Sequence, residues 1–335
     1  MNSKYLVHFL ILLLALSSAF IISNYSEDIS RSIIISVFEQ SRGSTFEILD
    51  TNGVPFINYG YWGDTYIGLQ RNPVQISQKS FVYYDQYING DNSSRQKVIN
   101  SADWLINNSN YTHNSAFLDV KFYWPLYNMS PPWRSGMAQG QALQTMILAH
   151  KLTGDNKYLV WGDLAVNSFD LDIKDGGFTN KTTNDGWWYE EYAGYGGDNP
   201  RVLNGMMFAT IGLYDYYNYT KNPQAKYYFD KGVIALTRNI ANYDNNGDTF
   251  YDIHGIIDPE YHQIHIDLSQ QLYNITGEKI FMDYSNKWKE YKKPIFIVRL
   301  IKNPDKLNLA ILIFNIVIIF SIFELAIFLR KYMKK

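Results

Sequence analysis

Two adjacent carboxylates lie within a run of aromatic residues. Glu190 and Glu191 belong to the sequence WYEEY, which ends at Tyr192. Consecutive residues of an extended segment point to opposite faces, so this pair cannot flank one glycosidic bond as the two carboxylates of a glycosidase do. A hydrolase would need a second acid from elsewhere, such as Asp252 or Asp215. The pair therefore argues against hydrolysis, and a solvated turn is its simplest structural interpretation.

Histidines form a second cluster. Three of the six, His254, His262 and His265, fall within twelve residues. His262 and His265 are spaced i, i+3, which places them on one face of a helix. With Asp267 or Asp258 as an oxygen ligand, they would have the composition of a metal site. We favour the simpler interpretation, which is that they are hydrogen-bonding histidines at the rim of a cleft.

Three tyrosines are further candidates for proton transfer. Tyr192, Tyr251 and Tyr261 each lie in, or at the edge of, a polar insert rich in Gly and Asp. A tyrosine ionises near pH 10, so it becomes an acid or base near neutral pH when nearby cations lower its pKa. Because the chain contains 28 Tyr, it is position rather than composition that singles out these three.

The segments around these clusters have the pattern of helices. Eight helices are predicted, in pairs whose members are separated by Gly, Asn and Asp clusters such as the one at 153–156. Their ranges are 75–88, 95–106, 137–152, 157–169, 202–217, 223–240, 261–273 and 278–291. Paired helices predict a mainly α chain that forms an α/α toroid, an incomplete α/α barrel whose inner helices line a central cleft. A helical bundle or a solenoid is the alternative.

Shorter elements accompany the helices. Two polar inserts, 176–197 and 243–259, interrupt the helical region, and structured loops of this kind commonly carry function. Near the start of the region, Thr51-Asn52-Gly53 lies between two β-prone runs and predicts a β-hairpin within residues 46–61.

Composition excludes several classes of protein. The chain has 335 residues, of which 46% are apolar and 19% charged, so wholesale disorder is excluded. A net charge of −2 gives no electrostatic match to nucleic acid. Cysteine is absent, which excludes disulfides, thiolate metal sites and cysteine nucleophiles. Aromatic residues reach 16%, and flat rings with polar edges suit a groove that stacks on sugars.

Both ends of the chain are apolar. Residues 5–22 are long enough to nearly span a bilayer, either as a cleaved signal peptide or as an anchor, and residues 307–329 predict a transmembrane helix. The chain is thereby divided into 1–23 (signal or anchor), 24–60 (linker and hairpin), 61–292 (toroid), 293–306 (basic linker), 307–329 (transmembrane helix) and 330–335 (basic tail).

Charge and sequons bear on which side the toroid occupies. Lys4 and the basic tail favour both termini inside and the toroid outside, on the extracytoplasmic or lumenal side. Eight N-x-[ST] sequons give modest support and make glycosylation an expectation. The opposite side is favoured by the basic residues before the last helix, which could instead meet lipid headgroups or a polyanion. These are Lys287, Lys289, Lys292, Lys293, Arg299, Lys302 and Lys306.

Five motifs occur in the order found in one known family. They are M-S-P at 129–131 followed by Trp133 and M-A-Q-G-Q-A at 137–142, W-Y-E-E-Y at 188–192, V-L-N-G at 202–205 with I-G-L-Y-D at 211–215, Y-D at 251–252, and Y-H-x-x-H-I at 261–266. From Tyr123 to Tyr291 the chain resembles the C-terminal domain of D-glucuronyl C5-epimerases, which convert glucuronate to iduronate in heparosan and heparan precursors.

The resemblance implies a fold and a set of catalytic residues. It implies an α/α toroid with catalytic Tyr192, Tyr251 and Tyr261, preceded in the first case by Glu191. Epimerisation removes the C5 proton of D-glucuronate and returns one to the opposite face, giving L-iduronate, and no metal or redox cofactor is needed. We expect Tyr261 and Tyr192 to serve the two faces. Glu191 would tune one of them, and Tyr251 would donate to the carboxylate or relay a proton.

The expected reaction also suggests which residues bind the substrate. The predicted set is Arg134, Trp188, Asn204, His254, His262 and His265. Arg134, His254 and His262 are candidates for the carboxylate, and Asn204 for a hydroxyl. The chain departs from its relatives at two of these positions, with His254 where they carry Arg soon after Y-D, and Arg134 where they usually have an aromatic residue. These departures bear on substrate identity more than on reaction type.

The predicted partner is an anionic, uronate-containing polysaccharide, met by a membrane-anchored protein that binds no nucleic acid; a homodimer is one option for its assembly. Two other functions stay open. A uronate lyase shares proton abstraction at C5 and then expels the C4 oxygen, whereas a non-catalytic glycan-binding protein keeps the aromatic residues without proton transfer.

Overall fold

The computed structural model describes residues 3–42, 46–112, 114–182, 186–194, 199–291, 295–302 and 306–333. The chain divides into two compact units. The larger comprises Thr45–Tyr291, and the smaller combines Met1–Ser44 with Lys292–Lys335.

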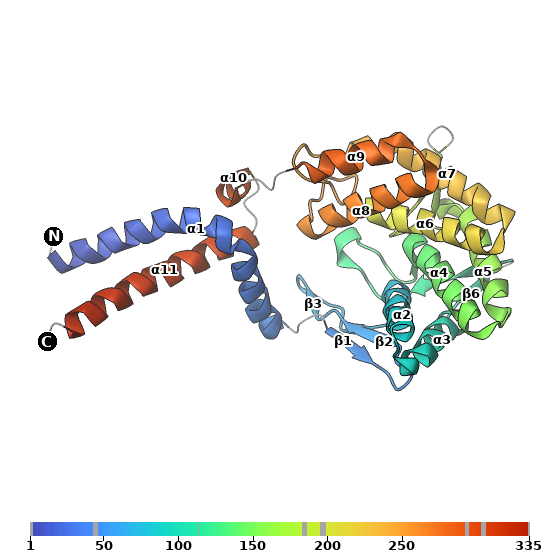
Figure 1. The fold of residues 1–335 in the computed structure, drawn as a ribbon, viewed down its shortest axis with the longest axis horizontal. Coiled ribbons are helices and arrows are strands. Elements are labelled where there is room, and N and C mark those ends of the chain that lie inside the picture. The colour runs from blue at the N-terminus through green and yellow to red at the C-terminus, as the bar shows by residue number, and fades with distance from the viewer. Residues whose placement is uncertain are drawn as a thin grey trace. The chain divides into compact units, whose positions relative to one another are not determined.

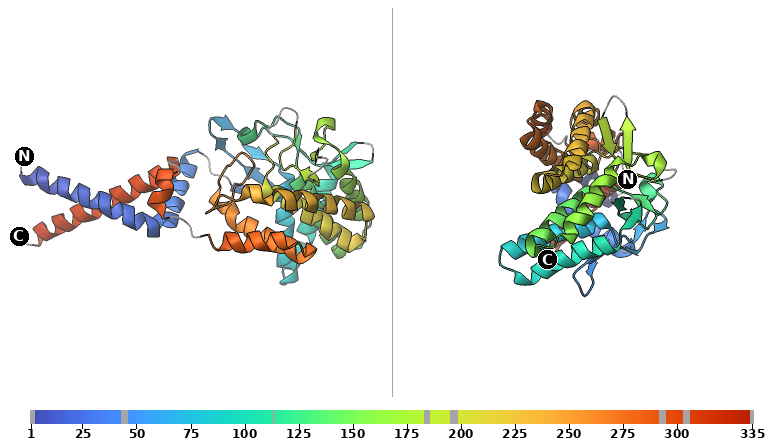
Figure 2. Two further views of the ribbon diagram at one scale, coloured as in Figure 1. Left: turned by 90° about the horizontal axis from the view of Figure 1, so that it is seen from above. Right: turned by 90° about the vertical axis from the view of Figure 1, so that its right-hand side faces the viewer.

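The larger unit is built from four consecutive helix pairs (Figure 1). They are α2 (Pro73–Ile88) with α3 (Asn92–Asn107), α4 (Gly136–Thr153) with α5 (Lys157–Asn167), α6 (Leu203–Thr220) with α7 (Pro223–Asn239), and α8 (Pro259–Thr276) with α9 (Lys279–Lys289). The first helices of the pairs, α2, α4, α6 and α8, pack against one another in that order, and their partners lie outside them. This arc is an incomplete α/α toroid, which confirms the predicted fold (Figure 2).

Local sequence signals start and stop these helices. The side chains of Asn72, Asp91, Ser135 and Asn222 each accept a hydrogen bond from a backbone N–H of the first turn of α2, α3, α4 and α7. At the other end of α4, Gly154 adopts a left-handed conformation with φ of 72°. The boundaries of the helices are therefore encoded locally, whereas their packing depends on the apolar faces.

Small residues let two inner helices approach closely. A Cβ placed on Gly140 of α4 would lie 2.7 Å from Cα of Ala209, and a Cβ on Gly212 of α6 would lie 2.2 Å from the carbonyl oxygen of Gly140. At this seam, the interface of α4 and α6 around Gly140 and Gly212, the two backbones are in direct contact and leave no room for a methyl group.

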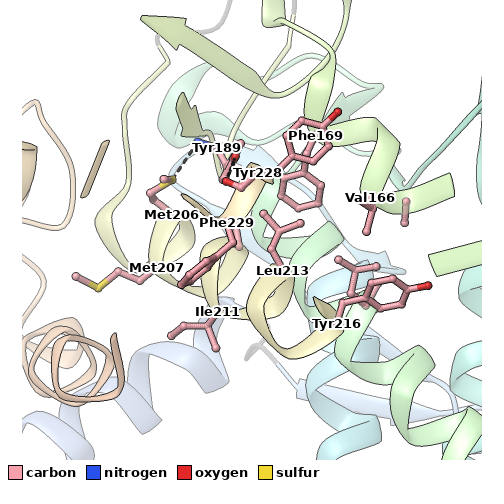
Figure 3. Close-up of a cluster of buried hydrophobic side chains, with 14 of the residues drawn as sticks. Val166, Phe169, Tyr189, Met206, Met207, Ile211, Leu213, Tyr216, Tyr228 and Phe229 are labelled. Atoms are coloured by element: carbon pink, nitrogen blue, oxygen red, sulfur yellow. Dashed lines mark hydrogen bonds between the residues drawn. The ribbon is translucent and has the colours of Figure 1, made fainter. Parts of the chain in front are cut away.

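Large side chains fill the space between the inner helices and their neighbours (Figure 3). Tyr189 is fully buried there, where its hydroxyl donates to the carbonyl oxygen of Tyr228 at 2.5 Å and its N–H lies 3.0 Å from Sδ of Met206. The ring of Phe169 meets that of Tyr189 edge to face, with centroids 4.9 Å apart. This core fixes the strand that leads directly to Glu190 and Glu191.

Short antiparallel strands lie before and between the helix pairs in the chain. A three-stranded sheet joins β1 (Phe46–Leu49), β2 (Pro55–Asn58) and β5 (Leu69–Gln70), and the turn at Gly53, with φ of 79°, confirms the predicted hairpin. Four two-stranded ladders complete the described strands. They pair β3 (Tyr61–Trp62) with β4 (Thr65–Tyr66), β6 (Asn110–Thr112) with β7 (Ser115–Phe117), β8 (Asp119–Val120) with β9 (Trp133–Arg134), and β10 (Thr179–Thr182) with β11 (Gly186–Tyr189).

The smaller unit is an antiparallel helical hairpin of α1 (Ser3–Arg42) and α11 (Lys306–Tyr332), with the short α10 (Phe296–Lys302) beside α1. Two segments, Tyr5–Glu27 and Leu307–Arg330, are long and apolar enough to cross a membrane, with mean hydropathies of 2.5 and 2.7. The sequence placed a linker from residue 24 onward. That boundary is wrong, because α1 continues as helix to Arg42.

Polar contacts connect the two long helices. His8 Nδ1 lies 2.6 Å from Glu324 Oε1. Nearer the other end of the hairpin, the side chain of Asn315 accepts from Ser30 at 2.8 Å and donates to Ser23 at 2.9 Å. Going along α1 from His8 to Ser30, the contacted residue on α11 changes from Glu324 back to Asn315. The two helices therefore run antiparallel, and both termini lie at the same end of the hairpin.

Replacement of Gly212 by Ala tests the α4–α6 seam. In an open helix, Gly→Ala is stabilising by roughly 1 kcal/mol. Here the added methyl meets the backbone of Gly140, so we expect Gly212→Ala to destabilise the full-length protein by about 1–3 kcal/mol, measured from its thermal unfolding in detergent. Arg238→Ala, an exposed change on α7, is the control. A stabilised Gly212→Ala protein would contradict the close approach.

Candidate active site

A cavity of about 360 Å³ opens at one end of the inner helices. We call it the tyrosine cleft. Its lining residues come from β2–α2, from the segment 120–137, from the stretch after β11, and from α6 and α8. They are Tyr59, Asn72, Val74, Gln75, Gln78, Val120, Phe122, Trp124, Trp133, Ser135, Met137, Glu191, Tyr192, Asn204, Phe208, Tyr261 and Ile264. Four of the residues predicted from sequence are among them, namely Glu191, Tyr192, Asn204 and Tyr261.

Of the three predicted tyrosines, Tyr192 and Tyr261 line this cleft, and Tyr251 lies against both of them. The hydroxyl oxygens of Tyr192 and Tyr251 are 3.3 Å apart, and the rings of Tyr251 and Tyr261 have centroids 4.5 Å apart. Tyr192 follows β11, Tyr251 lies in the loop before α8, and Tyr261 is in the first turn of α8. Three separate segments therefore deliver phenol groups to one place.

All three phenols hold their protons more tightly than a free tyrosine does. Burial raises the pKa of Tyr192, Tyr251 and Tyr261, and the charge of the neighbouring Glu191 raises each of them further. The condition for a tyrosine to act as a base near neutral pH, a pKa lowered by nearby cations, is therefore not met by these three residues. At neutral pH they are proton donors.

Glu191 is the ionisable carboxyl group of the cleft. Burial raises its pKa to about 7, while the hydroxyls of Tyr192 and Tyr251 act in the opposite direction. Its Oε2 has no hydrogen-bond partner. The carboxyl group fits against the first turn of α6 because position 205 is glycine, where a Cβ would lie 2.4 Å from that oxygen. Glu191 can therefore both hold and release a proton near neutral pH.

Glu190 points elsewhere, as adjacent residues of an extended segment must. Its Oε2 accepts the backbone N–H of Arg201 at 2.9 Å, and burial raises its pKa to about 8. Both carboxylates are buried, so the solvated turn considered for this pair is wrong. The acids considered as hydrolase partners lie outside the cleft lining: Asp252 accepts from the hydroxyl of Tyr127 at 2.7 Å, and Asp215 pairs with Gln144.

His262 and His265 contact the loop before α8 and do not line the cleft. His262 lies 3.2 Å from Oδ1 of Asp248, which raises its pKa, and 3.2 Å from the carbonyl oxygen of Trp288. His265 is fully buried with its Nδ1 2.8 Å from Oγ1 of Thr249, and burial lowers its pKa to about 3. Within the described ranges, no three His, Asp or Glu side chains are grouped as metal ligands would be.

Three further residues of the predicted substrate-binding set lie outside the cleft lining. Arg134 is committed elsewhere: its Nε donates to Asp119 at 2.9 Å, its guanidinium also donates to the carbonyl oxygen of Gly176 at 2.6 Å, and its Cζ lies 3.7 Å above the ring of Phe117. Trp188 is buried against Tyr243, with ring centroids 5.8 Å apart. His254 is exposed in the turn that follows Tyr251.

Sequence reasoning missed the polar residues that α2 and the segment before it contribute. Gln75 and Gln78 lie one turn apart on α2 and both line the cleft, and Asn72 donates to the hydroxyl of Tyr59 at 2.8 Å while capping the same helix. The available signal was the i, i+3 spacing of the two glutamines near a helix N-terminus. Trp124 was also missed; its indole N–H is buried without a partner.

Comparison with known proteins places this site in a family. The family model described as D-glucuronyl C5-epimerase C-terminus matches residues 112–290, more than half of the chain. The chain belongs to this family of carbohydrate epimerases. The helix pairs α4–α5, α6–α7 and α8–α9 lie within the matched region, as do Glu191 and the three tyrosines. The pair α2–α3 precedes it. Tyr59, Asn72, Gln75 and Gln78 precede it.

Two relatives are similar to this chain in sequence. An uncharacterised protein of Methanocaldococcus jannaschii is 29% identical over 285 residues, which cover 78% of this chain and 89% of that protein. The D-glucuronyl C5-epimerase of Caenorhabditis elegans is 27% identical over 212 residues, which cover 57% of this chain and 34% of the enzyme. The matched part is therefore about a third of the length of the animal relative.

Solved structures also show likeness at low identity. Cellobiose 2-epimerase from Bacillus thermoamylovorans has a TM-score of 0.47 at 12% identity, covering 73% of this chain and 74% of that one. A family 76 α-mannanase from Bacteroides thetaiotaomicron also has a TM-score of 0.47 at 12% identity, covering 89% and 75% of the two chains.

The raised pKa of Glu191 makes a prediction about stability. An unfolded glutamate has a pKa near 4.5, so the folded state binds the proton more tightly between pH 4.5 and 7. Its stabilising contribution is complete below pH 4.5 and is lost as the pH rises through 7. We expect Glu191→Gln to flatten the decline in unfolding free energy of the full-length protein from pH 5 to 8 by up to about 3 kcal/mol.

Chemical denaturation in detergent at several pH values measures this effect. Glu278→Gln, at an exposed carboxylate beside α9, is the matched control. Parallel pH profiles for wild type and Glu191→Gln would refute the raised pKa.

Proposed function

We propose that this protein is a uronic-acid C5-epimerase that converts D-glucuronate residues of a polysaccharide to L-iduronate. The observation that carries the proposal is the meeting of a carboxyl group of pKa about 7, Glu191, with Tyr192, Tyr251 and Tyr261 at one cleft. Membership of the D-glucuronyl C5-epimerase family supports the same chemistry.

Protonation states assign the roles. Epimerisation needs one group to take the C5 proton and a second to return a proton to the other face. Since the pKa values of the tyrosines are raised, Glu191 is the group that can be ionised at neutral pH, and it serves as the base directly or through the hydroxyl of Tyr192. Tyr261 comes from a different element, α8, and donates the proton to the opposite face.

The steps balance without another reactant. Glu191 takes the proton from C5, and the electron pair of the C5–H bond moves into the carboxylate to form an enediolate. The pair then returns to C5 as Tyr261 gives up its hydroxyl proton. Glu191 then loses its proton and Tyr261 regains one, by transfers through Tyr192, Tyr251 and solvent, so that both are ready for the next turnover.

Neutral donors would stabilise the charge that builds on the substrate carboxylate. The lining residues, all in the described part of the chain, include no Lys, Arg or His. Instead, the side-chain amides of Gln75, Gln78 and Asn204 line the cleft, and Asn204 lies in the first turn of α6, at the positive end of that helix. We propose that these groups take the role that sequence reasoning assigned to Arg134.

Deuterium incorporation tests the reaction. With a polymer of alternating glucuronate and N-acetylhexosamine in D₂O, the full-length protein should place deuterium at C5, and iduronate should accumulate without chain shortening. Tyr261→Phe should lower the rate of iduronate formation at least 100-fold, because general acid catalysis contributes about 10²–10⁴-fold. Tyr273→Phe, on the same helix but away from the cleft lining, is the control.

Each rival has its own signature in the same experiment. A lyase would produce shorter chains with a 4,5-unsaturated uronate end, and a non-catalytic binding protein would retain the polymer without isotope exchange. Either result would refute the epimerase. Wild-type iduronate formation by Tyr261→Phe would remove that residue from proton transfer.

We propose further that α1 and α11 both anchor the protein in a membrane, with the toroid on the extracytoplasmic or lumenal side. The polar contacts from His8–Glu324 to Ser30–Asn315 support a lasting α1–α11 hairpin and an α1 that is retained as an anchor. Part of the basic stretch is paired internally, since Arg299 contacts Glu27 and Lys287 contacts Asp244. Lys292 and Lys293 lie outside the described residues.

Because the chain has no cysteine, single introduced cysteines report the topology directly. An impermeant maleimide should label Asp155→Cys, in an exposed turn of the toroid, on intact cells. Met333→Cys, 79% exposed at the end of α11, should react only after lysis. The reverse pattern would place the toroid inside.

A further inference from the structure

Tyr192 is enclosed by aromatic rings beside the tyrosine cleft. Its ring centroid lies 4.9 Å from that of Tyr127, 5.4 Å from that of Trp133 and 6.4 Å from that of Trp124. Trp133 is itself fixed, because its indole N–H donates to the carbonyl oxygen of Phe122 at 2.8 Å. The position of the Tyr192 phenol therefore depends on where these three neighbouring rings lie.

One of these rings, that of Tyr127, is bound at its far end to a buried carboxylate. The hydroxyl of Tyr127 donates to Oδ2 of Asp252 at 2.7 Å, and both residues are buried. The other carboxylate oxygen, Oδ1, accepts the backbone N–H of Ile256 at 3.0 Å. Asp252 therefore joins the ring that supports Tyr192 to the turn that follows Tyr251.

The same turn holds the backbone of Tyr251. Its N–H donates to the carbonyl oxygen of Ile256 at 2.7 Å, and its own carbonyl oxygen accepts the N–H of Leu203 at 3.0 Å. Because Asp252 is the next residue, its carboxylate and the backbone of Tyr251 belong to one closed turn. The Tyr127–Asp252 bond thus connects the supports of the two phenols whose oxygens lie 3.3 Å apart.

We propose that Tyr127 and Asp252 are positioning residues whose hydrogen bond holds these two phenols at their observed separation. The inference rests on the proposed function, in which protons pass through Tyr192 and Tyr251. Tyr127 and Asp252 are both outside the described lining of the cleft, so neither is placed to touch the substrate. Loss of their bond should therefore change the rate of turnover and not the binding of the polymer.

Glu191 reports the same geometry without any turnover. Burial raises its pKa to about 7, and hydrogen bonds from the hydroxyls of Tyr192 and Tyr251 oppose this rise. If the phenols move when the Tyr127–Asp252 bond is lost, Glu191 loses these donors and its pKa rises further. The titratable groups that interact electrostatically with Glu191 are Glu190, Tyr127, Tyr192, Tyr251 and Tyr261.

Rates of iduronate formation by the full-length protein in detergent test the positioning. Tyr127→Phe removes the hydroxyl and keeps the ring. It should lower kcat about 10- to 100-fold, since misplacement by about 1 Å can cost 10²-fold, and leave KM for the polymer unchanged. The matched control is Tyr158→Phe, which removes another bond from a buried tyrosine to an aspartate, 3.0 Å long, between α5 and Asp103 of α3. It should keep the wild-type kcat.

Variants of Asp252 test whether the two residues act as one unit. Asp252→Asn keeps one carbonyl oxygen for two donors, so it should also lower kcat. Its addition to Tyr127→Phe should cause little further loss, because residues that share one interaction have non-additive effects. The proposal is overturned if the two losses multiply, if Tyr127→Phe keeps the wild-type kcat or changes KM alone, or if Tyr158→Phe loses as much activity.

The pH dependence of the unfolding free energy measures the pKa of Glu191. In each protein, comparison with the same protein carrying Glu191→Gln separates Glu191 from Glu190, whose pKa is about 8. Stability from a raised folded pKa is lost as the pH rises through that pKa. In Tyr127→Phe this loss should extend about one pH unit higher than in wild type, as expected for one hydrogen bond to a charged group.

Tyr158→Phe should show no such extension. An unchanged Glu191 pKa in Tyr127→Phe would mean that the phenols have not moved, and it would overturn the proposal even if kcat falls.

The two measurements separate this inference from the proposed function. A raised Glu191 pKa in Tyr127→Phe, in a protein whose wild type exchanges no C5 proton, would support the positioning bond and refute the epimerase. Wild-type iduronate formation together with an unchanged Glu191 pKa in Tyr127→Phe would overturn the positioning bond and leave the epimerase in place.

Discussion

The burial of one carboxyl group, that of Glu191, is the constraint on which the site depends. Desolvation moves its pKa to about 7, where it can take and release a proton. The same charge, added to the burial of the tyrosines, keeps their hydroxyls protonated. This burial is possible because Gly205 leaves space beside Oε2, and because the fully buried Tyr189 anchors the strand from which Glu191 emerges. The V-L-N-G and W-Y-E-E-Y motifs thus contact each other, because Gly205 of the first packs against Glu191 of the second.

The toroid supplies what such a site requires, which is acidic and basic groups held apart on rigid elements. The close seam of α4 and α6 at Gly140 and Gly212 orients the first turn of α6, and the histidines of α8 fix the loop that carries Tyr251. Under the proposed function, His262 and His265 would act by positioning this loop rather than by contact with the substrate. Arg134 has a comparable role, because its bonds to Asp119 and Gly176 tie β9 to β8 and to the turn before β10.

The described lining of the cleft has no Lys, Arg or His, so under the proposed function a uronate would be bound there without a full cation. Amide groups and the N-terminus of α6 offer partial positive charge without a full cation. A preorganised set of weak donors can stabilise an enediolate in a dry cleft, because its dipoles are already oriented when the charge forms.

The helix pairs, the 46–61 hairpin and the group of Glu191 with three tyrosines were determined by the sequence itself. Caps, glycines and apolar spacing act over a few residues, and the motifs name chemical groups directly. Tertiary structure alone decided which polar residues face the cleft. Arg134 and Trp188 have side chains suited to binding a sugar acid. In the structure, however, Arg134 forms an ion pair with Asp119, and Trp188 packs against Tyr243. Gln75, Gln78 and Trp124 carry no motif, and they line the site because α2 and the segment 120–137 fold onto segments distant in sequence. The pKa values were set in the same way, since desolvation depends on everything packed around a group and not on its neighbours in the chain.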